Sequence, residues 1–355
     1  MKSRTSTFQD ELSPEQTLAC RPKPLPDELI SSWLLRIALR NGMKPQSFCK
    51  LLWPNRSFWN HSIDRYASQD LLEDLSRCTA TPLQTLQKHS LAAYKGILFA
   101  DLIRNGNTPW VLPLGIFHRR FRRTGLSFCP ECLATGEPYF RRRWRLSLAT
   151  LCLIHKRPLL DGCSVCHEPL QPHRIDMGSK NPYTSAAVFR CSACSFDLRS
   201  ARSSTLTDLW LWKSESASDQ FLTATPCEAA RAMEYFSVLR HLLFMLTSRR
   251  SRLTPFRTLA ASAIPSPLVE SWKKDDETSL GFDAMRIDVR RVFIGAAYWL
   301  LEDWPRRFLD LACAARLRGS DLTRDFPSMP TSFAVVAANL PARQNELVLH
   351  QVMVP

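Results

Sequence analysis

Apolar side chains recur at helical spacing near the N-terminus, after a polar stretch over residues 1–24 that we interpret as a flexible leader. A first helix is predicted to begin near Pro26 and to end at Asn41-Gly42. A second is predicted to begin at Pro45 and to end at a Trp-Pro pair. Two helices joined by a short turn with a glycine are compatible with a helix-turn-helix, although most such pairs only pack a core.

Two further short helices are predicted near residues 69–78 and 82–94, so that residues 25–107 form an N-terminal helical domain. The segment TPWVLPLG, at residues 108–115, marks the end of this domain because its prolines interrupt the helical period. From there to residue 204 no helical period is visible, and we expect short ribbons and loops.

Helical periodicity returns in the C-terminal domain, predicted over residues 205–355. A long segment with an apolar face extends over residues 229–250, and a second helical block over residues 283–317 is interrupted at a Trp-Pro pair. The polar segment between them, residues 266–279, is expected to be exposed.

Four pairs of metal-binding residues, each with a two-residue spacer, follow one another in the middle of the chain: FCPEC at 128–132, CLIH at 152–155, CSVC at 163–166 and CSAC at 191–194. Zinc prefers thiolate and imidazole donors in a four-coordinate shell, and a two-residue spacer lets one turn supply two donors. The sequence therefore predicts two closed sites that each hold a structural Zn²⁺, with the ligands Cys129, Cys132, Cys152 and His155 in the first and Cys163, Cys166, Cys191 and Cys194 in the second.

Other uses of these pairs stay open at this point: an iron–sulfur cluster, a redox CxxC motif, or pairs crossed between the two sites. Sequential pairing is favoured because only a short linker separates His155 from Cys163. Two nearby histidines, His167 and His173, are predicted to be surface residues, since each site already has four donors.

These patterns together predict a mainly α protein with small zinc-ribbon β elements. We expect an N-terminal helix-turn-helix-like domain, a central tandem zinc-binding module over residues 108–204, and a C-terminal helical region.

The chain is strongly basic, with a formal net charge of +14 that binding of two zinc ions by seven thiolates lowers only modestly. Eight arginines lie in HRRFRRTG and FRRRWRLS, interleaved with aromatic residues. Arginine pairs with phosphate and stacks on bases, so nucleic acid is the expected partner. The predicted contacts are Arg119, Arg120, Arg122, Arg123, Arg141, Arg142, Arg143 and Arg145.

Motifs of phosphate-binding loops, metalloproteases, serine hydrolases and zinc deaminases do not occur in the sequence. We therefore predict no catalytic residues and a protein that is not an enzyme. The first residues lack the apolar core of a secretory signal, and no apolar run is long enough to span a membrane. A cytoplasmic protein of a bacterium is expected, with no membrane partner.

The run from FCPECL through YFRRRWRLSLATLCLIHKRPLLDGCSVC resembles the zinc-binding core of the TniQ/TnsD family, which selects targets for transposons with AAA+ regulators. The segments PDELISSWLLRIALRNGMKPQSF and AAYWLLEDWPRRFLDL are also similar to that family. The resemblance implies an N-terminal helix-turn-helix domain, two zinc modules and no catalytic centre. It also implies an adaptor that binds target DNA, or a CRISPR surveillance complex (Cascade), and recruits a TnsC-like AAA+ ATPase.

The alternative function is a transcription regulator that binds an operator and needs no ATPase; a nuclease or recombinase is a further rival. For the adaptor, the mixed charge of the N-terminal domain, from Asp27 and Glu28 to Arg36 and Arg40, marks a candidate ATPase surface. The same domain is nearly as well suited to a second DNA contact through Lys44, Gln46, Ser47 and Lys50. A homodimer is kept as a candidate assembly.

Overall fold

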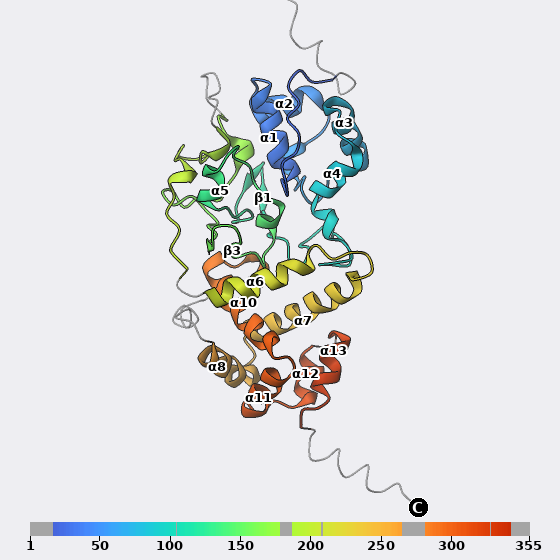
Figure 1. Ribbon diagram of the computed structural model, residues 1–355, viewed down its shortest axis with the longest axis vertical. Helices are drawn as coiled ribbons and strands as arrows, with labels where there is room; N and C mark the ends of the chain where they lie inside the picture. Colours follow the sequence, from blue (N-terminus) through green and yellow to red (C-terminus); the bar gives the residue numbers. More distant parts are fainter. Residues whose placement is uncertain are drawn as a thin grey trace, which may run out of the picture. The chain divides into compact units, whose positions relative to one another are not determined.

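The computed structural model describes residues 17–103, 105–177, 187–206, 209–264, 281–326 and 328–341. Within these residues the chain is mostly helical and contains two antiparallel two-stranded sheets (Figure 1), which confirms the predicted fold class. The polar segment predicted at 266–279 lies outside the described residues.

The chain divides into two compact units. The first comprises the residues up to Lys95 together with Asp101–Thr205, and the second comprises Gly96–Ala100 together with the residues from Leu206 onward. Both the predicted N-terminal helical domain and the predicted zinc-binding module thus fall almost entirely in the first unit. Their separation into two domains stays a prediction.

Helices α1 (Ile30–Arg40) and α2 (Pro45–Leu52) open the first unit. Asn41 and Gly42 end α1, with Gly42 in the left-handed region at a φ of 71°, where glycine carries no steric cost. The Asn41 side chain also donates to the carbonyl of Ile37 at 2.8 Å, in the last turn. The apolar faces of both helices are buried in one core, as the periodicity predicts.

The predicted helices near 69–78 and 82–94 correspond to α3 (Gln69–Thr79) and α4 (Leu83–His89), with α4 followed by the short 3₁₀ turn η2 (Leu91–Tyr94). A further 3₁₀ turn, η1 (Phe58–Asn60), lies in the predicted loop before α3. Figure 1 shows α1 to α4 together in one part of the first unit.

Short elements make up the rest of the first unit, as expected for a chain that folds around metal. The two sheets are the hairpins β1 (Ile116–Phe117) with β2 (Arg120–Phe121) and β3 (Leu151–Cys152) with β4 (Arg157–Pro158). Between and after them lie α5 (Pro130–Ala134) and the 3₁₀ turns η3 (Arg142–Arg145), η4 (Pro172–Arg174), η5 (Ala187–Phe189) and η6 (Leu198–Ser200).

Backbone hydrogen bonds join the start of α1 to the arginine-rich segment that precedes β3. The amide of Leu29 donates to the carbonyl of Phe140 at 2.9 Å, and the amide of Arg142 donates to the carbonyl of Asp27 at 2.7 Å. The buried hydroxyl of Ser32 accepts from the amide of Phe140 at 2.9 Å. These bonds satisfy buried polar groups of both segments, so each segment depends on the other for its stability.

The described residues of the second unit contain the helices α6 (Leu209–Phe221), α7 (Ala229–Thr247), α8 (Thr254–Ala263), α10 (Ile287–Glu302), α11 (Arg306–Ala314), α12 (Gly319–Asp325) and α13 (Thr331–Ala337), and the 3₁₀ turns η7 (Ser251–Leu253) and η9 (Phe282–Ala284). Its core forms where α10 packs on α6 and α7 (Figure 1). The predicted block at 283–317 contains α10 and α11, which meet at the Trp-Pro pair. None of the described helices is long and apolar enough to cross a membrane.

Candidate metal centres and basic surface

The four predicted ligands of the first metal site converge in the structure. The Nδ1 atom of His155 lies 3.5 Å from the Sγ atom of Cys129, 3.2 Å from that of Cys132 and 3.5 Å from that of Cys152. The three cysteines are buried and the histidine is half-buried. Cys129 and Cys132 flank the start of α5, whereas Cys152 ends β3 and His155 lies in the turn to β4.

The second set of predicted ligands is also brought together, in a more open position. The Sγ atoms of Cys163 and Cys194 are 3.6 Å apart, and those of Cys166 and Cys191 are also 3.6 Å apart. Cys163 and Cys191 are buried, but Cys194 is exposed. The pairing is therefore sequential, and the pairs are not crossed between the sites.

A hydrogen-bonded backbone turn explains how two residues separated by a two-residue spacer can both reach one metal ion. In three of the pairs, the residue after the second ligand takes a left-handed conformation: Lys156 with a φ of 52°, His167 with 58° and Ser195 with 60°. The amide of each donates, at 2.9 Å, to the carbonyl of the first ligand of its pair. The turn so closed points both ligand side chains toward one place, and it needs only local sequence to form.

The donor sets fit zinc. A tetrahedral ion with bonds of about 2.3 Å to sulfur and about 2.0 Å to nitrogen separates neighbouring donors by roughly 3.5–3.8 Å. The donor distances of 3.2–3.6 Å in both groups approach this spacing. Thiolates and imidazole are the donors of structural zinc, and four protein donors leave no position for a substrate.

The exposed arginines of the basic cluster lie on and beside the β1–β2 hairpin. Arg119, Arg120, Arg122 and Arg123 are all exposed, as the DNA-contact hypothesis requires. The guanidinium of Arg122 lies 4.2 Å from the ring centroid of Phe117, which is itself 52% exposed. Arg120 forms an ion pair with Glu168 at 2.8 Å. These cations therefore form a surface of the first unit, although part of their charge is already paired.

A strained turn places Arg119 at the tip of this hairpin. His118 and Arg119 both have positive φ, 44° and 65°, as a two-residue type I′ turn requires. Side chains on neighbouring elements hold the hairpin: the Oε1 atom of Gln171 accepts from the amide of Phe121 at 2.7 Å, and the Nε2–H of His173 donates to the carbonyl of Arg119 at 3.1 Å. The strain is thus offset by tertiary bonds.

The second run of arginines, at 141–145, is less exposed than its predicted role in binding phosphate requires. Arg143 and Arg145 are buried; Arg143 donates to the carbonyl of Leu151 at 2.9 Å, and Arg145 donates to the carbonyl of Gly125 and, at 3.2 Å, to the hydroxyl of Ser62. Their prediction as phosphate contacts is corrected, because interior guanidinium groups that bind carbonyls serve packing.

Arg141 and Arg142, the other two arginines of the run, are half-buried. Arg142 pairs with Asp27 at 2.9 Å, and the guanidinium of Arg141 lies 4.8 Å from the ring centroid of Tyr139. The exposed hairpin, and not this second run, is therefore the stronger candidate for a nucleic-acid contact.

The polar residues on and before α2 that are predicted to contact DNA differ in their exposure and bonding. The ammonium of Lys44 donates to the carbonyl of Asp176 at 3.0 Å. Ser47 and Lys50 are exposed, and Gln46 is half-buried. Gln46, Ser47 and Lys50 line a hollow together with Arg119 at the tip of the hairpin. The structure therefore brings residues from both parts of the predicted nucleic-acid contact to one place.

His173 contradicts its prediction as a surface residue. Its ring is 3% exposed and stacks on Trp59, with the ring centroids 4.9 Å apart and an angle of 16° between the planes. Burial lowers its pKa to about 4, so the ring is neutral at neutral pH. His167, by contrast, is exposed as predicted. Histidine occurs in cores and on surfaces, and no local pattern separates the two positions.

We expect the free energy of unfolding to fall by up to about 3 kcal/mol, through His173 alone, as the pH is lowered from 6.5 to 4. In this range the unfolded chain, with a histidine pKa of 6.5, binds a proton that the folded ring, with a pKa of about 4, does not. His173→Gln keeps an N–H donor for the Arg119 carbonyl but does not titrate. Its pH profile, measured by chemical denaturation, should be flatter than that of the unaltered protein.

The prediction is checked by comparing His173→Gln with the unaltered protein at each pH. This comparison is needed because Glu28 acts with the opposite sign in an overlapping pH range. Burial raises the pKa of Glu28 to about 7, so the folded protein holds a proton that the unfolded chain has lost, and the free energy of unfolding falls as the pH rises from 4.5 to 7. Identical profiles for His173→Gln and the unaltered protein would contradict the prediction.

The mixed charges predicted to recruit an ATPase are partly internal. Glu28 and Arg36 are buried and form an ion pair at 2.6 Å, and Arg36 also pairs with Glu137 at 2.9 Å. Asp27 is engaged by Arg142, as described above. The hypothesis that these residues form a recruiting surface is corrected, because Glu28 and Arg36 are buried and because Arg36 and Asp27 join α1 and its start to the segment that follows α5.

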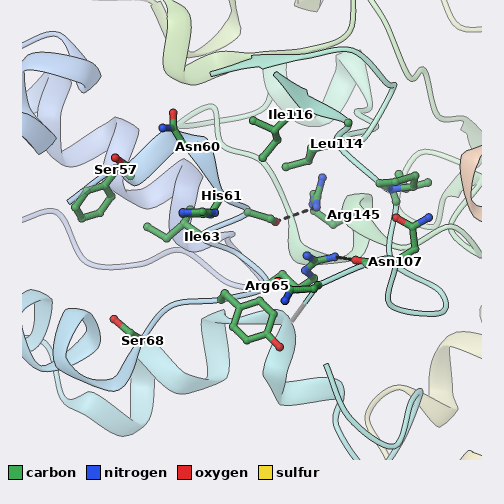
Figure 2. Close-up of a pocket in the computed structure, with 18 of the residues that line it drawn as sticks. Ser57, Asn60, His61, Ile63, Arg65, Ser68, Asn107, Leu114, Ile116 and Arg145 are labelled. Carbon is green, nitrogen blue, oxygen red and sulfur yellow. Dashed lines mark hydrogen bonds between the residues drawn. The ribbon is translucent and has the colours of Figure 1, made fainter. Parts of the chain in front are cut away.

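A cleft of about 890 Å³ in the first unit was not predicted from the sequence. It lies between residues 56–71 and 105–116, and Arg145 is part of its wall (Figure 2). Arg56, Arg65 and Arg145 line it, and no acidic side chain does so among the described residues. Burial lowers the pKa of Arg145 to about 10, which leaves this guanidinium charged at neutral pH. The cleft is therefore a cationic hollow.

A family model described as TniQ matches residues 19–159. The matched residues contain α1 to α4, the β1–β2 hairpin and the first metal site, whereas the second metal site and the part of the second unit from Leu206 onward lie outside the match. A comparison with curated proteins finds no match to this chain.

Proposed function

Because residues 19–159 form a TniQ-family domain, which associates the chain with transposition, we propose that the protein is a non-catalytic adaptor that selects the transposition target. It binds target DNA, or a targeting complex already on DNA, and recruits an AAA+ ATPase that regulates the transposase. The family match is the observation that carries this proposal. The two closed metal centres support it, because they stabilise the fold and offer no position for a substrate.

Contact with DNA is assigned to the exposed face of the β1–β2 hairpin and the neighbouring face of α2. Four exposed arginines within residues 119–123 supply charge for phosphate groups. The hairpin is anchored by Gln171 and His173, so the arginines are presented from a rigid support, which lowers the entropic cost of binding.

Recruitment of the ATPase is assigned to the exposed face of α3, in place of the buried charges of α1. This face carries Glu73 and Arg77, both exposed and neither lining the cleft or the hollow beside the hairpin. A recruiting surface must be separable from the DNA contact, because the adaptor has to hold both partners at once. The mixed charge of α3 meets that condition and differs from the uniformly basic hairpin.

We expect the charge exchange Glu73→Arg with Arg77→Glu to reduce capture of the AAA+ ATPase of the same transposon by at least tenfold, while duplex DNA binding stays unchanged. The expected loss follows because like charges replace complementary ones at the contact. The measurement is a pull-down of the purified ATPase on the immobilised full chain, with DNA binding followed by fluorescence anisotropy.

A matched control exchanges an exposed ion pair in the second unit, Arg286→Glu with Asp288→Arg, which lie 2.8 Å apart. This variant should capture the ATPase normally. Full capture by the α3 variant would show that the recruiting surface lies elsewhere. If the unaltered chain captures no ATPase, the adaptor function itself is wrong, and a regulator that acts without an ATPase becomes the better description.

A further inference from the structure

A hollow of about 270 Å³ lies where α2, the segment that follows it and the tip of the β1–β2 hairpin converge. All of these segments belong to the first unit. The residues that carry polar or charged groups into the hollow are Gln46, Ser47, Lys50, Asn55, Arg56, Ser57 and Arg119. Its volume is below the roughly 300–1,000 Å³ of pockets for drug-sized ligands, so a small ionic group fits it better than a whole organic ligand.

The charges around this hollow are of one sign. Lys50, Arg56 and Arg119 line it, and no acidic side chain does so within the described part of the chain. Arg56 is partly neutralised, since it pairs with Asp70 and lies 3.8 Å from Asp74. The side chains of Lys50 and Arg119 make no hydrogen bond or ion pair with any described residue. Two cations from distant parts of the sequence are therefore free to bind one anion.

Neutral donors complete the hollow. The Nε2 atom of Gln46 is buried and has no hydrogen-bond partner among the described residues. A buried donor without a partner is unfavourable, so an acceptor bound beside it would gain a hydrogen bond that the hollow by itself does not supply. The hydroxyl groups of Ser47 and Ser57 and the amide of Asn55 add further donors at the same place.

The two cations come from supports that the fold holds in place. Lys50 is on α2, whose apolar face is buried in the core with α1. Arg119 is held in a left-handed conformation, with its carbonyl bonded to the buried ring of His173 at 3.1 Å. A site assembled before its ligand arrives binds with a smaller entropic cost than two free surface side chains.

We propose that this hollow binds a single phosphate group of the DNA backbone, between Lys50 and Arg119. The phosphate oxygens accept from both cations and from the amide of Gln46. The site deepens the proposed function, because it rests on the DNA contact assigned to this surface and fixes the register of α2 on the duplex. A phosphate group from a free nucleotide or from inorganic phosphate has the same chemistry, and the experiment separates these sources.

The test compares Lys50→Ala, Arg119→Ala and the double variant for binding to a 30-base-pair DNA duplex at several salt concentrations. Loss of one phosphate contact lowers the slope of log K against log [salt] by about 0.9. We expect the double variant to lose about 0.9, because both cations serve one phosphate. Two independent contacts would together lose about 1.8, and that result would overturn the shared site.

Lys88→Ala is the matched control, since Lys88 is exposed on α4 and does not line the hollow. Its slope should equal that of the unaltered chain. An unchanged slope in the double variant, with zinc content and unfolding temperature retained, overturns the site but leaves the arginine surface and the adaptor function standing. Absence of duplex binding by the unaltered chain overturns both the site and the DNA contact of the proposed function.

Calorimetric titrations with inorganic phosphate and with thymidine monophosphate separate the sources. We expect neither to bind measurably below millimolar concentration, because a duplex gains its affinity from several contacts at once. Tight binding of either small anion, lost in the double variant while duplex binding is kept, would assign the hollow to a free ligand and overturn the DNA source.

Discussion

Purified protein should contain two zinc ions per chain, and Cys129→Ser should release one of them and unfold most of the first unit. Structural zinc contributes folding free energy directly, on the order of 10 kcal/mol per site in small modules. The effect should be larger at the first site than at the second, because its three cysteines are all buried whereas Cys194 of the second site is exposed. Elemental analysis and thermal unfolding measure both effects.

Cys194→Ser should also lose one zinc ion, with a smaller loss of stability, because this ligand is exposed at the edge of the second site. The control is Cys20→Ser, which changes an exposed cysteine that belongs to neither metal site. That variant should keep two zinc ions and its unfolding temperature. Iron in the purified protein, or folded protein with fewer than two zinc ions, would contradict the assignment.

Replacing Arg119, Arg120, Arg122 and Arg123 together with alanine should weaken duplex DNA binding and make it less dependent on salt. If each arginine contacts a separate phosphate, the log–log slope falls by about 3.6, at about 0.9 per contact. A smaller fall is expected, because Arg120 is already paired with Glu168. Anisotropy titrations between low and physiological salt give the slope directly.

The matched control removes the same net charge from exposed arginines elsewhere in the described structure: Arg77, Arg190, Arg286 and Arg306. This variant should show only the small change expected from a lower overall charge. Equal effects of the two quadruple variants would mean that the hairpin has no special contact with DNA, and that the protein binds through its general basic charge.

Local patterns were sufficient for the metal centres and for most helices. A two-residue spacer closes one turn through a hydrogen bond between residues four apart, so no distant contact is needed to direct the two ligands of a pair. Helix periodicity likewise reports which face meets a core, and α1, α2 and α3 begin and end within a few residues of their predicted limits.

Local patterns did not predict which charged residues are buried and which are exposed. Arg145 and Arg119 are both arginines in basic runs, yet one binds carbonyls in the interior and the other is exposed at the tip of a hairpin. Glu28 and His173 are likewise buried by segments far away in the sequence. Exposure of a long polar side chain depends on what packs over it, and a single sequence carries no local signal of that.

The amino-acid sequence by itself determined the donors of both metal sites, the helical class of the chain and its strongly basic character. These properties depend on residue types and on spacings of a few residues, which act through local backbone geometry. Only the tertiary structure decided which arginines face solvent, and only it brought Lys50 of α2 beside Arg119 of the hairpin. That meeting depends on packing between segments about seventy residues apart, where core burial and tertiary hydrogen bonds set the positions of the side chains.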